Sequence, residues 1–163
     1  MRQLAIIWHS MTGGSQALAK AAYDGAQTIH GVDVQLCDAL YAGADVMLAA
    51  DGYLFVFPEN LAAISGGMKS FFDRCYYPCL GTLNGRPYAM MVCAGSDGTN
   101  AVAQAERIAT GWRLRQIAPS VIVCTYAQTA EAMLAPKIID SDKLSDAAQL
   151  GAQLATGLEM GIY

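Results

Sequence analysis

Short apolar runs, each bounded by glycine, proline or polar residues, recur along the chain and constrain its fold most strongly. LAIIW (4–8) and YAMMVCA (88–94) are apolar throughout, which is typical of strands buried on both faces. The third run should end at Pro58, because proline cannot donate to a sheet ladder. We expect five strands, over residues 4–8, 32–39, 51–58, 88–94 and 119–127.

Predicted helices lie between most of these strands, over residues 15–29, 66–74 and 101–114, and a last one follows at 141–160. The first of them carries alanine and leucine at helical spacing. Strands that alternate with helices predict a parallel sheet with right-handed crossovers and helices on both faces. Five strands suit a doubly wound α/β fold with the flavodoxin-like order 2-1-3-4-5. The length of 163 residues predicts a single domain, residues 1–163.

Charge and cysteine content exclude several classes of function. The formal net charge is -4 and no cluster of Lys or Arg exceeds a pair, so we expect no nucleic-acid partner. No apolar stretch is long enough for a membrane span or a signal peptide, which predicts a cytoplasmic protein without membrane insertion. The five cysteines are expected to be reduced core thiols. Cys75 and Cys79 have no histidine nearby to complete a metal site.

In this strand order, ligands bind at the carboxyl ends of the strands, where the order reverses between the first and third strands. The loops after Trp8, Phe57 and Cys93 are therefore the candidates for a site. The first of them, HSMTGGSQAL (9–18), leads directly into a predicted helix.

Hydroxyl and glycine residues crowd the first loop. Amide groups at a helix N-terminus, together with hydroxyls that bring no charge, form a cradle for a phosphate group. The spacing matches neither the P-loop, since no Lys-Ser/Thr follows the glycines, nor GxGxxG, since the glycines are adjacent. A turn with a simple helix cap remains the alternative. The residues concerned are Ser10, Thr12, Gly13, Gly14 and Ser15.

The second loop and the helix after it, FPENLAAISGGMKSFFDR (57–74), form the most specific stretch of the chain. Ser65 to Arg74 resembles the Ser-Gly-x-Met-Lys-x-Phe-x-Asp-Arg helix of flavodoxin-like NAD(P)H-dependent FMN reductases and their quinone-reductase relatives. The first loop is similar to the Ser-x-Thr-Gly-x-Ser/Thr phosphate site of those families. The resemblance implies a flavoprotein oxidoreductase with noncovalent FMN and with NADH or NADPH as electron donor.

The resemblance also implies which residues hold FMN. The phosphate would lie at the hydroxyl and glycine positions of the first loop, and the flavin ring would contact the second and third loops mostly through main-chain atoms. Flavin N5 would carry the chemistry, with no catalytic side chain and no metal. The implied cofactor-binding residues are His9, Ser10, Met11, Thr12, Gly13, Gly14, Ser15, Pro58, Glu59, Asn60, Leu61, Ala94, Gly95, Ser96 and Asn100. A lone loop histidine such as His9 more often bonds to neighbouring groups than to a ligand.

An FMN protein of this fold is either a reductase or an electron carrier. Residues 60–67 and 94–100 contain no aromatic side chain to cover the ring, which leaves room for a nicotinamide to stack. Residues 58–65 contain no glycine, whereas a carrier commonly depends on a peptide that flips beside the ring. Both observations favour hydride transfer from NAD(P)H through FMN to a small acceptor such as a quinone or free flavin. A flavodoxin-type electron carrier without its own substrate is the alternative.

Two further expectations complete the sequence analysis. A response-regulator receiver shares this strand order but needs paired acids after the first strand, and Trp8 and His9 stand there instead. The helix from Met68 to Arg74 suits packing between subunits, so we expect a homodimer or homotetramer.

Overall fold

The computed structural model describes residues 1–163 and contains a central parallel sheet. The sheet has the order β2-β1-β3-β5-β6, with β7 also pairing with β5. In terms of the five predicted strands this is the order 2-1-3-4-5, so the predicted topology is confirmed. The strands are β1 (Arg2–Trp8), β2 (Val32–Asp38), β3 (Gly52–Asn60), β5 (Pro87–Ala94), β6 (Arg115–Gln116) and β7 (Val121–Cys124).

Two strands differ from the sequence prediction. The fifth strand, predicted over residues 119–127, is the shorter β7, and β6, which was not predicted, precedes it and also pairs with β5. The third strand does not end at Pro58 but continues to Asn60 and turns back into the antiparallel strand β4 (Ala63–Ile64). β1 ends opposite Val56, so Pro58 lies beyond the part of β3 that is hydrogen-bonded on both sides.

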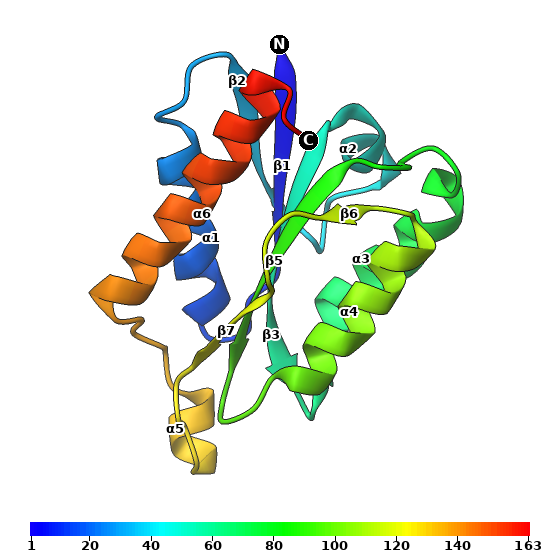
Figure 1. Cartoon of the computed structure of the whole chain (residues 1–163). Helices are drawn as coiled ribbons and strands as arrows, with labels where there is room; N and C mark the ends of the chain where they lie inside the picture. The colour runs from blue at the N-terminus through cyan, green and yellow to red at the C-terminus, as the bar shows by residue number, and fades with distance from the viewer.

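Helices cover both faces of the sheet, as predicted (Figure 1). α1 (Gly14–Ala26) and α6 (Ser141–Met160) lie on one face, and α3 (Gly66–Cys79) and α4 (Thr99–Gly111) on the other. α3 extends beyond its predicted end at Arg74 and takes Pro78 into its last turn. Two short helices were not predicted, α2 (Ala44–Ala49) and α5 (Ala130–Leu134), since neither is long enough to show helical periodicity.

The two faces of the sheet are packed differently. Under α1 and α6 the core is aliphatic, with Ile6 and Leu54 at 0% exposure. Under α3 and α4 it is aromatic, where Phe72 makes edge-to-face contacts with Phe55 and with Trp112 at centroid distances of 5.4 and 5.8 Å. Both faces of the sheet are therefore buried under helices, and loops lie at its carboxyl edge.

The cysteines are free, and Cys75, Cys79 and Cys93 are buried. Burial raises the pKa of Cys75 to about 11, so this thiol is protonated and unreactive at neutral pH. Cys37 and Cys124 are only half-buried, so they do not fit the expectation of core thiols fully. No His, Cys, Asp or Glu side chains gather in a group of three or more that could hold a metal ion. None of the helices combines the length and the apolar character that a membrane span requires.

α1 and α6 approach each other through two glycines. An ideal Cβ built on Gly25 would lie 2.0 Å from the carbonyl oxygen of Ala148, and one on Gly151 would lie 2.0 Å from that of Ala22. Real carbon and oxygen atoms do not approach so closely, so only glycine permits this spacing of the helix backbones.

We expect Gly151→Ala to lower the free energy of unfolding by about 2 kcal/mol or more, because the added methyl group forces two packed backbones apart. The matched control is Gly66→Ala, where an added Cβ meets no heavy atom within 4 Å and the change should stay within about 1 kcal/mol. Urea denaturation of both variants measures the difference. Equal stabilities would contradict the packing seen between α1 and α6.

Candidate functional site

Four segments meet at the carboxyl edge of the sheet, at the bottom of Figure 1. They are the loop after β1, the β3–β4 hairpin, the loop after β5 and the segment that follows β7. The strand order reverses between β1 and β3, so this edge holds the crevice in which open α/β sheets bind ligands. The loops that the sequence analysis selected are therefore brought together.

The loop after β1 turns into α1 at Gly13, whose φ of 97° is in the left-handed region. The Ser10 hydroxyl accepts a hydrogen bond from the Gly13 amide at 2.9 Å and fixes this turn. A Cβ on Gly13 would meet nothing within 4 Å, so the space in front of the turn is open. The amides of Gly14, Ser15 and Gln16 lie in the first turn of α1 and have no helical carbonyl to bind.

Ser15 provides the most specific polar group in this loop. The residue is 1% exposed, and its hydroxyl oxygen has no hydrogen-bond partner. An unpaired buried hydroxyl costs about 1–3 kcal/mol, so its presence requires an explanation. Together with the free amides of the first turn, it forms a set of uncharged donors suited to an anion. A phosphate group therefore fits these residues.

The β3–β4 hairpin has a strained turn. Leu61 and Ala62 have φ values of 51° and 60°, in the left-handed region, although neither is glycine. The Asn100 amide group donates to the carbonyl oxygen of Ala62 at 2.5 Å, and the Gln104 side chain accepts from the Ile64 amide at 3.0 Å. Two residues of α4 thus hold the turn in its strained conformation.

The loop after β5 is tied to the hairpin and to the end of β7. The Glu59 carboxylate accepts a hydrogen bond of 2.6 Å from the Gly98 amide. The carbonyl oxygen of Gly95 accepts one of 2.8 Å from the Tyr126 amide. The predicted ring-contact residues are thus assembled on adjacent loops, but the side chains of Glu59 and Asn100 already bind neighbouring loops.

His9 takes a different position from the rest of its loop. Its side chain is buried at 6% exposure, and Nδ1 lies 2.8 Å from the hydroxyl oxygen of Ser65, just before α3. An ideal Cβ on Gly67 would lie 2.4 Å from His9 Nε2, so the ring is enclosed by α3. Burial lowers the pKa of His9, and the nearby Asp38 carboxylate opposes this effect. The structure therefore places His9 in a contact between the first loop and the start of α3.

The segment after β7 contributes two residues that sequence reasoning missed. Tyr126 is 73% exposed, has a φ of 56°, and lies beside Gly95 through the hydrogen bond described above. The Lys137 amide donates to the carbonyl oxygen of Thr12 in the first loop at 2.8 Å. One signal was available in the sequence, because Lys137 is the only Lys or Arg between Arg115 and Lys143.

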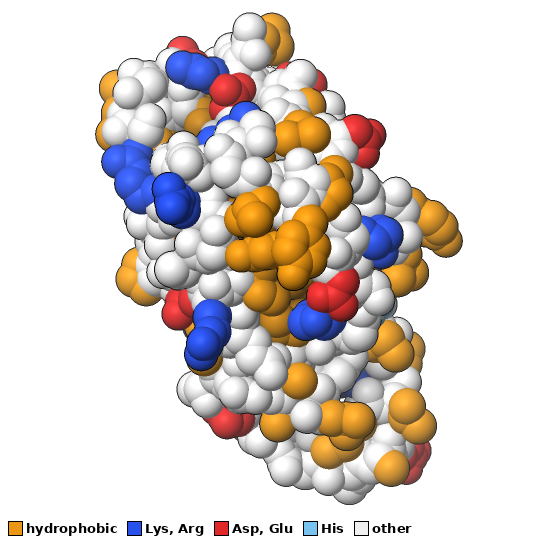
Figure 2. Space-filling model, turned by 90° about the vertical axis from the view of Figure 1, so that its right-hand side faces the viewer, with side chains coloured by type: hydrophobic (Ala, Val, Ile, Leu, Met, Phe, Trp, Pro, Cys, Tyr) orange, Lys and Arg blue, Asp and Glu red, His pale blue; other side chains and the backbone are white.

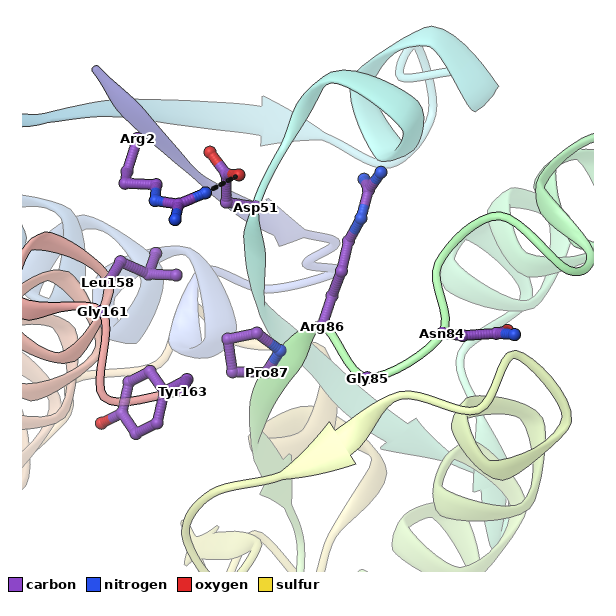
Figure 3. Close-up of a pocket in the computed structure, with 9 residues that line it drawn as sticks. All are labelled: Arg2, Asp51, Asn84, Gly85, Arg86, Pro87, Leu158, Gly161 and Tyr163. Carbon is purple, nitrogen blue, oxygen red and sulfur yellow. Dashed lines mark hydrogen bonds and ion pairs between the residues drawn. The ribbon is translucent and has the colours of Figure 1, made fainter.

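The structure has two further hollows. One, of about 230 Å³, is at the amino ends of the strands (Figure 3). Its Arg2 and Asp51 form an ion pair at 2.9 Å, while Arg86 points away from it to carbonyls at the end of α2. The other is a groove of about 730 Å³ between α3 and α4, which includes Tyr76 and Ile108. Figure 2 shows apolar side chains on the face that carries these helices.

Comparison with known proteins gives a family and a fold. The family described as NADPH-dependent FMN reductase matches residues 10–128. A flavodoxin of Aquifex aeolicus (strain VF5) is 30% identical over 104 residues, which are 63% of this chain and 56% of that protein. The alignment thus covers only a little over half of the length of that relative.

Two solved structures have the same fold at low sequence identity. The flavodoxin of Streptococcus pneumoniae TIGR4 has a TM-score of 0.74 at 19% identity, with 94% of this chain and 98% of that one covered. The flavodiiron core of Flv1 from Synechocystis sp. PCC6803 has a TM-score of 0.76 at 16% identity, with 98% of this chain but 36% of that one covered. These similarities establish a flavodoxin-like fold.

The burial of His9 predicts a pH dependence of stability. The folded chain binds a proton at His9 less readily than the unfolded chain does, so the free energy of unfolding falls as the pH decreases below 6.5. His9→Asn should reduce this slope, measured by urea denaturation between about pH 8 and about pH 5. His30→Asn is the control, since His30 is exposed. Identical slopes for the two variants would contradict the effect.

Proposed function

Because the chain belongs to the NADPH-dependent FMN reductase family, we propose that it binds FMN noncovalently and reduces a small acceptor with electrons from NADH or NADPH. FMN, when bound, supplies the hydride chemistry at its N5 atom. The residues of this chain bind and orient the cofactor and leave one side of the site accessible. In this proposal, residues 1–163 act as one FMN-binding domain.

The observation that carries the proposal is the buried, unpaired hydroxyl of Ser15 at the start of α1. A phosphate group would accept from this hydroxyl and from the amides of the first helical turn, which no other group satisfies. The open space in front of Gly13 provides room for it. Thr12 and Ser10 provide further hydroxyls in the same loop.

The hairpin and the loop after β5 would hold the flavin ring. Pro58, Asn60 and Leu61 would face one part of the ring and Ala94, Gly95 and Ser96 another, mainly through backbone atoms. The hydrogen bonds from Asn100 to Ala62 and from Gly98 to Glu59 fix the relative positions of these loops before any ligand arrives. Such preorganisation lowers the entropic cost of orienting a second reactant against the ring.

The carboxyl edge is suited to an apolar small molecule rather than to a charged protein partner. Met11, Leu61, Leu134 and Ile138 are exposed there, at 67%, 101%, 79% and 94%. The carboxylates of Glu59 and Asp97 accept hydrogen bonds from nearby loop groups. A protein redox partner is commonly steered by a charged surface, and this edge offers little free charge. A quinone or free flavin is the acceptor class we propose.

One observation favours the alternative of a flavodoxin-type electron carrier. The exposed ring of Tyr126 emerges beside Gly95, so an aromatic side chain is available at the edge of the site. The second and third loops, residues 60–67 and 94–100, contain no aromatic side chain. The homodimer or homotetramer also stays a prediction, for which the groove between α3 and α4 offers an apolar face.

The proposal predicts that the purified chain binds added FMN reversibly and that NADH or NADPH then bleaches the visible flavin absorbance under anaerobic conditions. Stopped-flow absorbance with each nicotinamide measures the rate, and a quinone added afterwards should restore the absorbance. Absence of FMN binding would overturn the cofactor assignment. FMN that binds but is reduced by neither nicotinamide would overturn the reductase and support the carrier.

Ser15→Ala should change stability and binding in opposite directions. Removal of a buried, unpaired hydroxyl should leave the free energy of unfolding of the FMN-free chain unchanged or raise it by about 1 kcal/mol. The affinity for FMN should fall about tenfold, because one phosphate donor is lost. Ser145→Ala, on the exposed side of α6, is the control for both measurements. An unchanged affinity in Ser15→Ala would place the phosphate elsewhere.

A further inference from the structure

The segment from Tyr126 to Lys137 forms an arch over the carboxyl edge, with its two ends bonded to two different loops of the site. At one end the Tyr126 amide donates to Gly95 after β5, and at the other the Lys137 amide donates to Thr12 before α1. Between these points α5 contributes no buried residue. The position of Lys137 relative to the first loop is therefore set by the backbone rather than by packing.

The side chain of Lys137 is also held in place. Its ammonium group donates to the carbonyl oxygens of Ala132, Met133 and Ala135 at 2.9, 2.8 and 2.6 Å. These are orphan carbonyls at the end of α5, where a cation is favourable. The positive charge is thus fixed in one place and is not spread over the many rotamers of a free lysine.

The Cβ atom of Lys137 lies beside the first turn of α1. Lys137 Cβ lies 3.4 Å from an ideal Cβ on Gly14, and Cys93 Sγ lies 2.7 Å from the same point. Burial raises the pKa of Cys93 to about 11, and the Lys137 ammonium opposes that rise. The ammonium group extends from this Cβ atom to the α5 carbonyls, so the charge lies within one side-chain length of the start of α1.

Lys137 is the only Lys or Arg within the loops of this edge, where the other cation is the Arg74 guanidinium, which reaches the Ala39 and Ala42 carbonyls from α3. The segments 9–13, 39–43, 58–65, 95–98 and 125–140 contain no other Lys or Arg. The donors of the first loop are neutral, whereas a phosphate monoester carries about two negative charges at neutral pH. The net charge of -4 on the chain as a whole opposes the approach of such an anion.

We propose that Lys137 is the residue that makes this site prefer FMN to riboflavin, by placing a fixed positive charge beside the phosphate cradle. The inference rests on the proposed function, since it assumes that the cradle at Ser15 holds the FMN phosphate. Lys137 acts on the phosphate through its charge, and the neutral donors of the first loop make the direct contacts. The flavin ring, which FMN and riboflavin share, does not depend on this charge.

The test compares two ligands that differ only in the phosphate. Dissociation constants of FMN and riboflavin are measured by quenching of flavin fluorescence with the flavin-free chain and with Lys137→Gln, whose amide can still donate to the α5 carbonyls. We expect the affinity for FMN to fall about tenfold at low salt and that for riboflavin to change less than about twofold. Lys137→Arg should retain the preference, and Lys143→Gln, which removes an exposed charge on α6, should leave it unchanged.

The possible outcomes distinguish the role of Lys137 from the proposed binding of FMN. Equal weakening of both ligands in Lys137→Gln would show a purely structural role for the arch and would overturn the inference, as would unchanged binding of both. Failure of the unmodified chain to bind FMN would overturn the proposed function itself. A second measurement needs no variant: raising the salt from about 0.02 M to about 0.5 M should reduce the preference of the unmodified chain for FMN. A salt-independent preference would also overturn the inference.

Discussion

The hydrogen-bond ladders on both sides of β1 determine where the site lies. β1 pairs with β2 along one edge and with β3 along the other, so the chain leaves β1 for α1 from within the sheet. The chain must turn directly from Trp8 into α1, and Gly13 makes that turn in a conformation that other residues rarely adopt. The direction of α1, its free amides and the buried hydroxyl of Ser15 all follow from this geometry.

The loops around the site are held by one another rather than by the core. Glu59, Asn100 and Gln104 each bind a backbone group of a different segment, and His9 binds Ser65 across the base of the site. The His9–Ser65 contact is buried, so breaking it would leave a desolvated polar group. The hydroxyl of Ser15 stands out against this background, since it is a buried side-chain polar atom without a hydrogen-bond partner.

Features that depend on neighbouring residues in the sequence could be predicted from the sequence. The strands and their order, the start of α1 and the glycine and hydroxyl residues of the first loop could be predicted from apolar runs and turn residues. The hairpin could not, because its turn has left-handed Leu61 and Ala62 where a prediction looks for glycine or asparagine. The placement of His9 depends on Ser65, which is 56 residues away. Contacts of that kind leave no trace in spacing or composition.

The arch between β7 and α6 separates two properties of the molecule. Backbone hydrogen bonds near its ends join it to the loops after β5 and before α1, and α5 buries no side chain. Its apolar side chains can therefore be exchanged without disturbing the packing of the strands or the cradle at α1. Substitutions in this short segment would change the surface that a small molecule contacts at the carboxyl edge. The fold of the remaining chain would not change. In proteins of this architecture, the segment between β7 and α6 can therefore change in sequence without affecting folding.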